Sequence, residues 1–207
     1  SGGAASTCVN GSPPVDYDVD DFGNVVAVRV PWSGAGTTSE TRFEYNALGL
    51  VTRRETQVMR NGGVYETFTY DQLGRLTSRL KQGVGGTAQL FALTYDAPVT
   101  GTNCPSAATA RVLGRLGYRD DSFGRTGYSY DPEGRVVSEW GQRSGSVGTQ
   151  CLVSASYNNA AVYPTTQYAY SANGNLTSIR YPQGRTVSYA YGSGALSDRV
   201  GSISTTT

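Results

Sequence analysis

Four aspartates are the first candidates for catalytic residues in this sequence. Each stands three residues before a glycine. They are Asp20, Asp71, Asp121 and Asp131. A pair of carboxylates can act as general acid and base in a hydrolase. An aspartate at the first position of a type I turn, however, accepts a backbone N–H, and a glycine at the fourth position tolerates positive φ. The spacing therefore favours turn capping, and we predict no catalytic residue.

The absence of histidine excludes several classes of catalytic and metal site. The 207 residues contain no His, which removes Ser-His-Asp and Cys-His nucleophilic systems and most zinc sites. We therefore predict neither a cofactor nor a metal site. The net charge of +1 gives no electrostatic reason to expect nucleic acid or an anionic membrane as partner. No apolar run approaches the roughly 18 residues of a membrane-spanning helix.

Three cysteines, Cys8, Cys104 and Cys151, allow one disulfide out of three pairings. A Cys104–Cys151 bridge would join two irregular stretches of the chain and offset their entropy, and it would suit an exported protein. The alternative is three free thiols in a cytosolic protein. The two tryptophans, Trp32 and Trp140, adjoin Gly-rich stretches, so we regard them as candidate ligand-binding residues.

A turn tetrad recurs along the chain, with an Asp-like residue first and Gly fourth. Its copies are Asp20–Gly23, Asn46–Gly49, Asp71–Gly74, Asp121–Gly124, Asp131–Gly134, Ser171–Gly174 and, more loosely, Tyr181–Gly184. Each predicts a type I turn followed by a left-handed bulge residue, which closes an antiparallel hairpin. We expect tight turns of this kind at one edge of a sheet and softer Gly-rich loops at the other.

Aromatic pairs precede most of these turns at a spacing of two, which places both side chains on one face of a strand. This aromatic ladder consists of Tyr17, Phe43, Tyr45, Phe68, Tyr70, Tyr128, Tyr130, Tyr168 and Tyr170. Such aromatics more often build the packed face of a sheet than a glycan- or peptide-binding strip. An Arg follows several of the glycines, and we expect it to lie over a Tyr ring across the hairpin.

The turn glycines recur about every 25 residues, which is the signature of an internal repeat whose units are stabilised by their neighbours. One copy is missing near residue 99, where Tyr95-Asp96-Ala97-Pro98-Val99 has Val in place of Gly. We predict an irregular lead-in at 1–14, a repeat sheet over 15–200 with surface insertions near 97–112 and 141–165, and an unpaired Ser/Thr-rich tail at 201–207. The fold class is all-β, with almost no helix.

Two segments, Tyr70-Asp71-Gln72-Leu73-Gly74-Arg75-Leu76 and Tyr130-Asp131-Pro132-Glu133-Gly134-Arg135-Val136, resemble the YD repeat of the RHS family. Tyr181-Pro182-Gln183-Gly184-Arg185 is similar to a segment common in bacterial RHS proteins. The family includes bacterial polymorphic toxins, cocoon subunits of insecticidal toxin complexes and teneurins. The resemblance covers about 15–200 and implies a curved or spiralling antiparallel sheet of stacked hairpins, an open segment of a β-shell. The family's cleavage motif has Leu after Asp-Pro-x-Gly, where this chain has Arg135.

The resemblance implies a non-enzymatic structural module, part of a shell around a toxin or of an extracellular scaffold. We expect it to pair through its sheet edges with neighbouring repeats or with another copy, and to be secreted or on the cell surface of a bacterium. The alternative is an adhesion or carbohydrate-binding module that recognises a surface glycan and assembles into fibres. A carboxylate-dependent hydrolase ranks third. The chain opens Ser1-Gly2-Gly3 without Met, so we expect a processed protein or a piece of a longer one.

Overall fold

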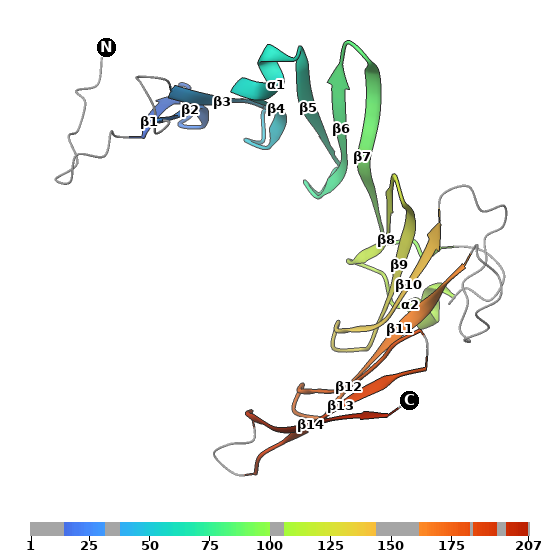
Figure 1. The fold of residues 1–207 in the computed structure, drawn as a ribbon. Helices are drawn as coiled ribbons and strands as arrows, with labels where there is room; N and C mark the ends of the chain where they lie inside the picture. The colour runs from blue at the N-terminus through green and yellow to red at the C-terminus, as the bar shows by residue number, and fades with distance from the viewer. Residues whose placement is uncertain are drawn as a thin grey trace. The chain divides into compact units, whose positions relative to one another are not determined.

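A computed structural model describes residues 15–31, 38–99, 106–143, 162–182, 184–193 and 198–206. The side chains of Trp32, Cys8, Cys104 and Cys151 and the lead-in at 1–14 lie outside these ranges. Fourteen strands are antiparallel neighbours in the order of the chain, from β1 to β14 (Figure 1). The two described helices are short. The predicted all-β fold of successive hairpins is therefore confirmed.

The chain divides into two compact units, Ser1–Phe91 and Ala92–Thr207. The N-terminal unit contains β1 (Asp16–Val19), β2 (Val25–Pro31), β3 (Thr38–Tyr45), β4 (Val51–Thr56), α1 (Gln57–Asn61), β5 (Val64–Tyr70) and β6 (Leu76–Gly83), and β7 (Gly86–Tyr95) begins in it. The C-terminal unit contains α2 (Ala107–Ala110), β8 (Leu116–Asp121), β9 (Gly124–Tyr130), β10 (Val136–Arg143), β11 (Val162–Tyr170), β12 (Leu176–Arg180), β13 (Thr186–Tyr191) and β14 (Val200–Thr206).

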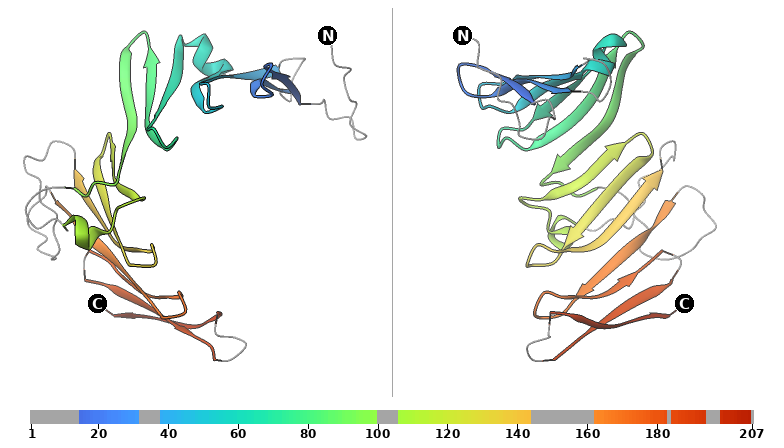
Figure 2. Two further views of the ribbon diagram at one scale, coloured as in Figure 1. Left: turned by 180° about the vertical axis from the view of Figure 1, so that it is seen from behind. Right: turned by 60° about the vertical axis from the view of Figure 1, so that its left-hand side comes forward.

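Connections from an odd strand to the next even strand define what we call the turn side, and connections from an even strand to the next odd strand define the loop side. In the C-terminal unit the reversals after β9 and β11 lie together on the turn side (Figure 2). In the N-terminal unit α1 stands on the loop side between β4 and β5 (Figure 1). Thr56 caps α1 by accepting a hydrogen bond from the N–H of Met59 at 3.2 Å.

Most hairpins on the turn side contain a β-bulge beside the turn. In β3–β4 the register passes from Glu44↔Arg53 to Tyr45↔Val51, so Thr52 is the extra residue. The same shift occurs between Thr69 and Tyr70 in β5–β6, and at the equivalent places in β1–β2, β9–β10 and β11–β12. The bulge therefore repeats with the turn.

Buried apolar side chains concentrate in the C-terminal unit. One cluster joins Val99 to Trp140, with Tyr118 against it. The other joins Ala110, Val112 and Tyr130, with Tyr128 and Val136 against it. In the described part of the N-terminal unit the only buried apolar side chain is Ala27.

Two sequence-based expectations about segments need correction. The described residues 201–206 of the expected tail are not unpaired, because β14 pairs with β13 from Thr186↔Thr206 to Tyr191↔Val200. Val200, Ile203 and the threonines of this segment favour a strand, and the edge of β13 offers the segment backbone partners. The described ends of the 97–112 insertion are not a surface loop either, since Val99, Ala110 and Val112 are among the most buried side chains of the protein.

Candidate functional site

The repeated turns of the turn side have one geometry. The N–H of the first residue donates to the carbonyl of the residue after the glycine, and the glycine N–H donates to the carbonyl of the first residue. The glycine φ lies between 74° and 88°, where only glycine avoids steric strain. These are type I turns with a left-handed bulge residue. They occur at Asp20–Gly23, Asn46–Gly49, Asp71–Gly74, Asp131–Gly134 and Ser171–Gly174.

The carboxylates of these turns are occupied by hydrogen bonds. Asp71 accepts the N–H groups of Leu73 and Arg75 at 2.9 Å each, and its second oxygen accepts the Arg75 Nε–H at 2.7 Å. Asp131 accepts the N–H and Nε–H of Arg135 at 2.8 and 2.6 Å. Partial burial raises the pKa of both carboxyls, but these hydrogen bonds outweigh it and hold each pKa below its usual value.

Two predicted tetrads lie on the loop side. The Asp121–Gly124 turn has a two-residue loop, because Asp121 pairs directly with Gly124 in the β8–β9 ladder. Gly124 has φ 144°, and the Asp121 carboxylate accepts the N–H groups of Phe123 and Gly124 at 2.9 and 3.2 Å. Tyr181–Gly184, between β12 and β13, keeps the hydrogen bonds of the turn-side tetrads, with Gly184 at φ 87°. Tight turns therefore occur on both sides of the sheet, whereas we expected them at one edge and Gly-rich loops at the other.

The second tyrosine of each repeat links its hairpin to the preceding one. Its hydroxyl donates to the backbone carbonyl of the residue two positions after the turn-side glycine of the preceding hairpin, which for Tyr130 is Gly114. The pairs are Tyr45 to Val25 at 2.7 Å, Tyr70 to Val51 at 2.7 Å, Tyr130 to Leu116 at 2.8 Å, Tyr170 to Val136 at 2.9 Å and Tyr191 to Leu176 at 2.8 Å. We call these contacts the tyrosine links. Tyr191 is a member of this set that the sequence-based ladder omits.

Arginines that follow a turn glycine stack on tyrosine in two ways. Arg125 lies 4.2 Å from the centre of the Tyr118 ring across its own β8–β9 hairpin, as expected, whereas the arginines of the turn side stack on the tyrosine of the next hairpin. The Arg135 guanidinium lies 4.7 Å from the centre of the Tyr170 ring, and that of Arg115 lies 5.5 Å from the centre of the Tyr130 ring. Arg135 also pairs with Asp131 in its own turn. One arginine thus ties a turn to the adjacent hairpin through an ion pair and a cation–π contact.

The copy of the turn that the sequence lacks near residue 99 is assembled from two separate segments. The Asp96 N–H donates to the Arg115 carbonyl at 3.1 Å, and the Gly114 N–H donates to the Asp96 carboxylate at 2.5 Å. Gly114 has φ 74°. Asp96 and Gly114 therefore take the places that Asp71 and Gly74 hold in the continuous turn, and Val99 is not the replaced glycine. We call this arrangement the split turn.

The other predicted site residues differ in how deeply their side chains are buried. Tyr17 is largely exposed on β1, whereas Phe43, Phe68 and Tyr168 are half-buried. Trp140 is only 4% exposed, beside Val99, and a side chain on Gly127 would collide with its indole. Trp140 also lines the hollow beside β8 to β10, but with so little of its indole exposed it offers a ligand there little ring surface to stack on. Trp32 and the Cys104–Cys151 bridge fall outside the described residues and stay predictions.

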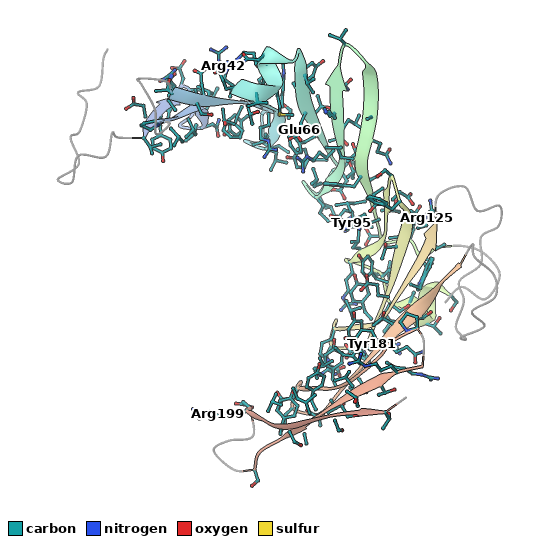
Figure 3. The ribbon with its side chains drawn as sticks, viewed as in Figure 1. Arg42, Glu66, Tyr95, Arg125, Tyr181 and Arg199 are labelled. Atoms are coloured by element: carbon teal, nitrogen blue, oxygen red, sulfur yellow. The ribbon has the colours of Figure 1, made fainter. Side chains whose placement is uncertain are left out.

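An open groove of about 560 Å³ crosses β1 to β4 in the N-terminal unit. Its charged side chains pair with one another: Glu40, for example, receives Arg29 at 3.2 Å and Arg42 at 3.0 Å. Strand register places Arg42 and Glu66, both labelled in Figure 3, on opposite faces of this unit's sheet. The lining has four carboxylates and three guanidiniums, and the remaining negative charge is offset by Arg60 of α1, which pairs with Glu40. The groove therefore lacks the spare charge that would attract an ionic ligand.

A second hollow, of about 350 Å³, lies beside β8 to β10 and includes Glu139. The Tyr168 hydroxyl donates to the Glu139 carboxylate at 3.4 Å. Burial, with the nearby Glu139 charge, raises the pKa of both Tyr128 and Tyr168. Across the described ranges we find no group of three or more His, Cys, Asp or Glu side chains placed to hold a metal ion. Neither described helix has the length and hydrophobicity needed to cross a membrane.

The chain is similar to a known protein family and to solved structures. The RHS Repeat family model matches residues 165–206. No curated protein matches the chain. Among solved structures, the "Crystal Structure of TcdB2-TccC3" superimposes with a TM-score of 0.68 at 18% identity, covering 94% of this chain and 9% of that one. The "Structure of Photorhabdus luminescens Tc holotoxin pore, Mutation TccC3-D651A" gives a TM-score of 0.64 at 18% identity, with the same coverage.

This chain spans about 9% of the length of those two matched chains, and the likeness shows a shared fold. The family match falls on β11 to β14, which contain the Ser171–Gly174 turn and the Tyr170 and Tyr191 links. The same turn and the same link recur in the earlier hairpins. The family model and the fold together confirm the resemblance to RHS/YD-repeat proteins, with residues 165–206 as an RHS repeat.

Proposed function

We propose that this chain is a non-enzymatic structural segment of a larger RHS-type β-shell, exported from the cell, which encloses a toxin or serves as an extracellular scaffold. The observation that carries the proposal is an unbroken ladder of antiparallel strands that ends in an open edge at β14. A sheet that pairs strand after strand in chain order can be lengthened by further repeats without rearrangement.

The β14 edge is suited to receiving another strand. Its seven residues are exposed, and they include neither a charged side chain nor a proline. Natural sheets usually protect an open edge with charges, prolines or a very short strand. β1 at the other edge is protected in this way, because it has four residues, of which Asp16 and Asp18 are charged. The contrast supports β14 as the side on which a neighbouring repeat or another copy pairs.

A non-enzymatic role is supported by the state of the aspartates. Asp20, Asp71 and Asp131 each use their carboxylate oxygens to hold a turn, and Asp121 does so on the loop side. A catalytic acid or base needs a proton or a lone pair available to substrate. The enclosed toxin and the export are supported by the fold shared with a structure titled as a Tc holotoxin pore.

Self-association through β14 can be tested with Ile203→Lys, which introduces a charge on an exposed edge position. Sedimentation velocity at several concentrations should show wild-type chain associating and the variant remaining monomeric. Tyr17→Lys, also at an exposed edge position but on β1, is the matched control and should associate as wild type does. A wild-type monomer at every concentration, or association unaffected by Ile203→Lys, would contradict pairing through this edge.

A further inference from the structure

The N-terminal unit is connected by charges at each step from β1 to β6. Asp18 pairs with Arg29 between β1 and β2, and Arg29 pairs with Glu40 at 3.2 Å between β2 and β3. Glu44 pairs with Arg53 at 3.1 Å between β3 and β4. The remaining two steps are Arg54–Glu66 at 2.8 Å between β4 and β5, and Glu66–Arg79 between β5 and β6. The first three pairs lie on one face of this unit's sheet and the last two on the other face, and we call the whole set the ion-pair ladder.

Two carboxylates are the junctions of the ladder. Glu40 on β3 faces Arg29 of β2, Arg42 of its own strand and, at 2.9 Å, Arg60 of α1. Gln57 of α1 lies beside Arg60, and Glu55 of β4 stands opposite Arg42 in the register. Arginines thus surround Glu40 from β2, β3 and α1, with one further carboxylate nearby.

Glu66 on β5 is the more deeply placed junction, at 4% exposure. It faces Arg54 of β4 and Arg79 of β6, and Lys81 stands opposite it in the register. The Nε–H groups of Arg54 and Arg79 are buried without an acceptor. A buried carboxylate with two guanidiniums depends on all three charges being present, because loss of one leaves the others uncompensated.

The C-terminal unit is built differently. Among its described residues, Asp120–Arg125 is the one ion pair between neighbouring strands, while Arg119–Asp121 and the pairs of Arg135 are local. Both buried apolar clusters belong to this unit. Apolar burial does not depend on proton or salt concentration in the way that ion pairing does.

We propose that the N-terminal unit is an acid- and salt-sensitive section of the sheet, which opens while the C-terminal unit stays folded. Turn aspartates with a lowered pKa occur in both units, Asp20 and Asp71 in the N-terminal unit and Asp131 in the C-terminal unit, so they do not by themselves distinguish the units. The pKa of Asp18 is lowered mainly by its hydrogen bond to Arg29. Partial burial raises the pKa of Glu40, but hydrogen bonds from Arg42 and Arg60 and their charges outweigh it and hold that pKa below its usual value. Stability from such groups is present above the unfolded pKa of about 4 and is lost as pH falls through the folded pKa.

Hydrogen exchange measured by mass spectrometry on the whole chain separates the two units. With intrinsic rates corrected, protection over β2 to β6 should fall about tenfold or more between about pH 6 and pH 3.5, with a much smaller change over β8 to β13. At neutral pH, raising NaCl from about 0.05 M to 1 M should have the same selective effect, because the screening length shortens to about 3 Å. Equal loss in both units, or earlier loss in the C-terminal unit, would overturn the proposal.

Variants identify the carboxylates responsible. Glu40→Gln should loosen β2 to β4 at neutral pH and reduce the fold-change that acid produces there. Glu133→Gln, which removes an exposed carboxylate paired with Arg135 in the C-terminal unit, is the control and should behave as wild type. If Glu40→Gln leaves the N-terminal unit unfolded, the wild-type salt series decides the question. An unchanged acid response in a folded Glu40→Gln would also overturn the proposal.

Discussion

The tyrosine links can be tested most directly at Tyr130, where the donor is buried and the acceptor is known. Tyr130→Phe keeps the ring between Val112 and Arg115 but removes the hydroxyl that donates to the Leu116 carbonyl at 2.8 Å. A neutral hydrogen bond contributes about 0.5–1.5 kcal/mol net, and an acceptor left without a partner adds to the loss. We expect the free energy of unfolding to fall by about 1–2 kcal/mol. For a unit near 100 residues each kcal/mol lowers Tm by roughly 4–8 °C.

Urea unfolding followed by tryptophan emission provides the assay. In a Trp32→Phe background the signal comes from Trp140, which lies in the C-terminal unit with Val99 and Tyr118. The shift in midpoint multiplied by the m-value gives the change in free energy of unfolding. A change below about 0.3 kcal/mol at unaltered m would refute the claim that the link stabilises the sheet.

Three further outcomes follow from the turns, the tyrosines and the cysteines. Gly23→Ala should lose about 1–2 kcal/mol from strain at φ 86° alone. Gly134→Ala should lose more, because its new methyl group would come within 2.8 Å of the Arg115 guanidinium and displace it from the Tyr130 ring and the Arg111 carbonyl; thermal melts of the two variants test the order. Burial raises the pKa of the tyrosines that make four of the links, Tyr45, Tyr70, Tyr130 and Tyr170. The stability that these neutral hydroxyls contribute is therefore complete below the unfolded pKa of about 10 and is lost as pH rises through the folded pKa values. Tyrosinate absorbance and circular dichroism, recorded together, should change at the same pH. Intact mass measured with and without reductant should differ by two hydrogens if Cys104 and Cys151 form a bridge, and an unchanged mass would leave free thiols.

The turns could be predicted because their physics is local. An Asp or Asn side chain bonds backbone two to four residues away, and glycine supplies the positive φ within the same tetrad, as at Asp71–Gly74. The strands between the turns follow from the same repeat. Sequence spacing alone therefore identified the all-β class and the hairpin architecture.

What sequence reasoning missed depends on contacts between distant residues. The split turn joins Asp96 to Gly114 across 18 positions, although the triplet Leu113-Gly114-Arg115, a copy of Leu73-Gly74-Arg75, was a usable signal. Stacking of Arg135 on Tyr170 instead of across its own hairpin depends on how adjacent hairpins are placed. Burial of Trp140 depends on Val99, which comes from a segment that the repeat does not describe.

The split turn shows that the two ends of a reversal can be held in register while the chain between them makes a long excursion. The entropy of closing such a loop grows only slowly with its length, and here Val99, Ala110 and Val112 fasten the excursion onto the strands. Foreign peptide could accordingly be grafted between an Asx and a Gly-Arg pair at other reversals, such as Asp71–Gly74, with the strand pairing preserved. The repeat would then be a framework for displaying guest sequences.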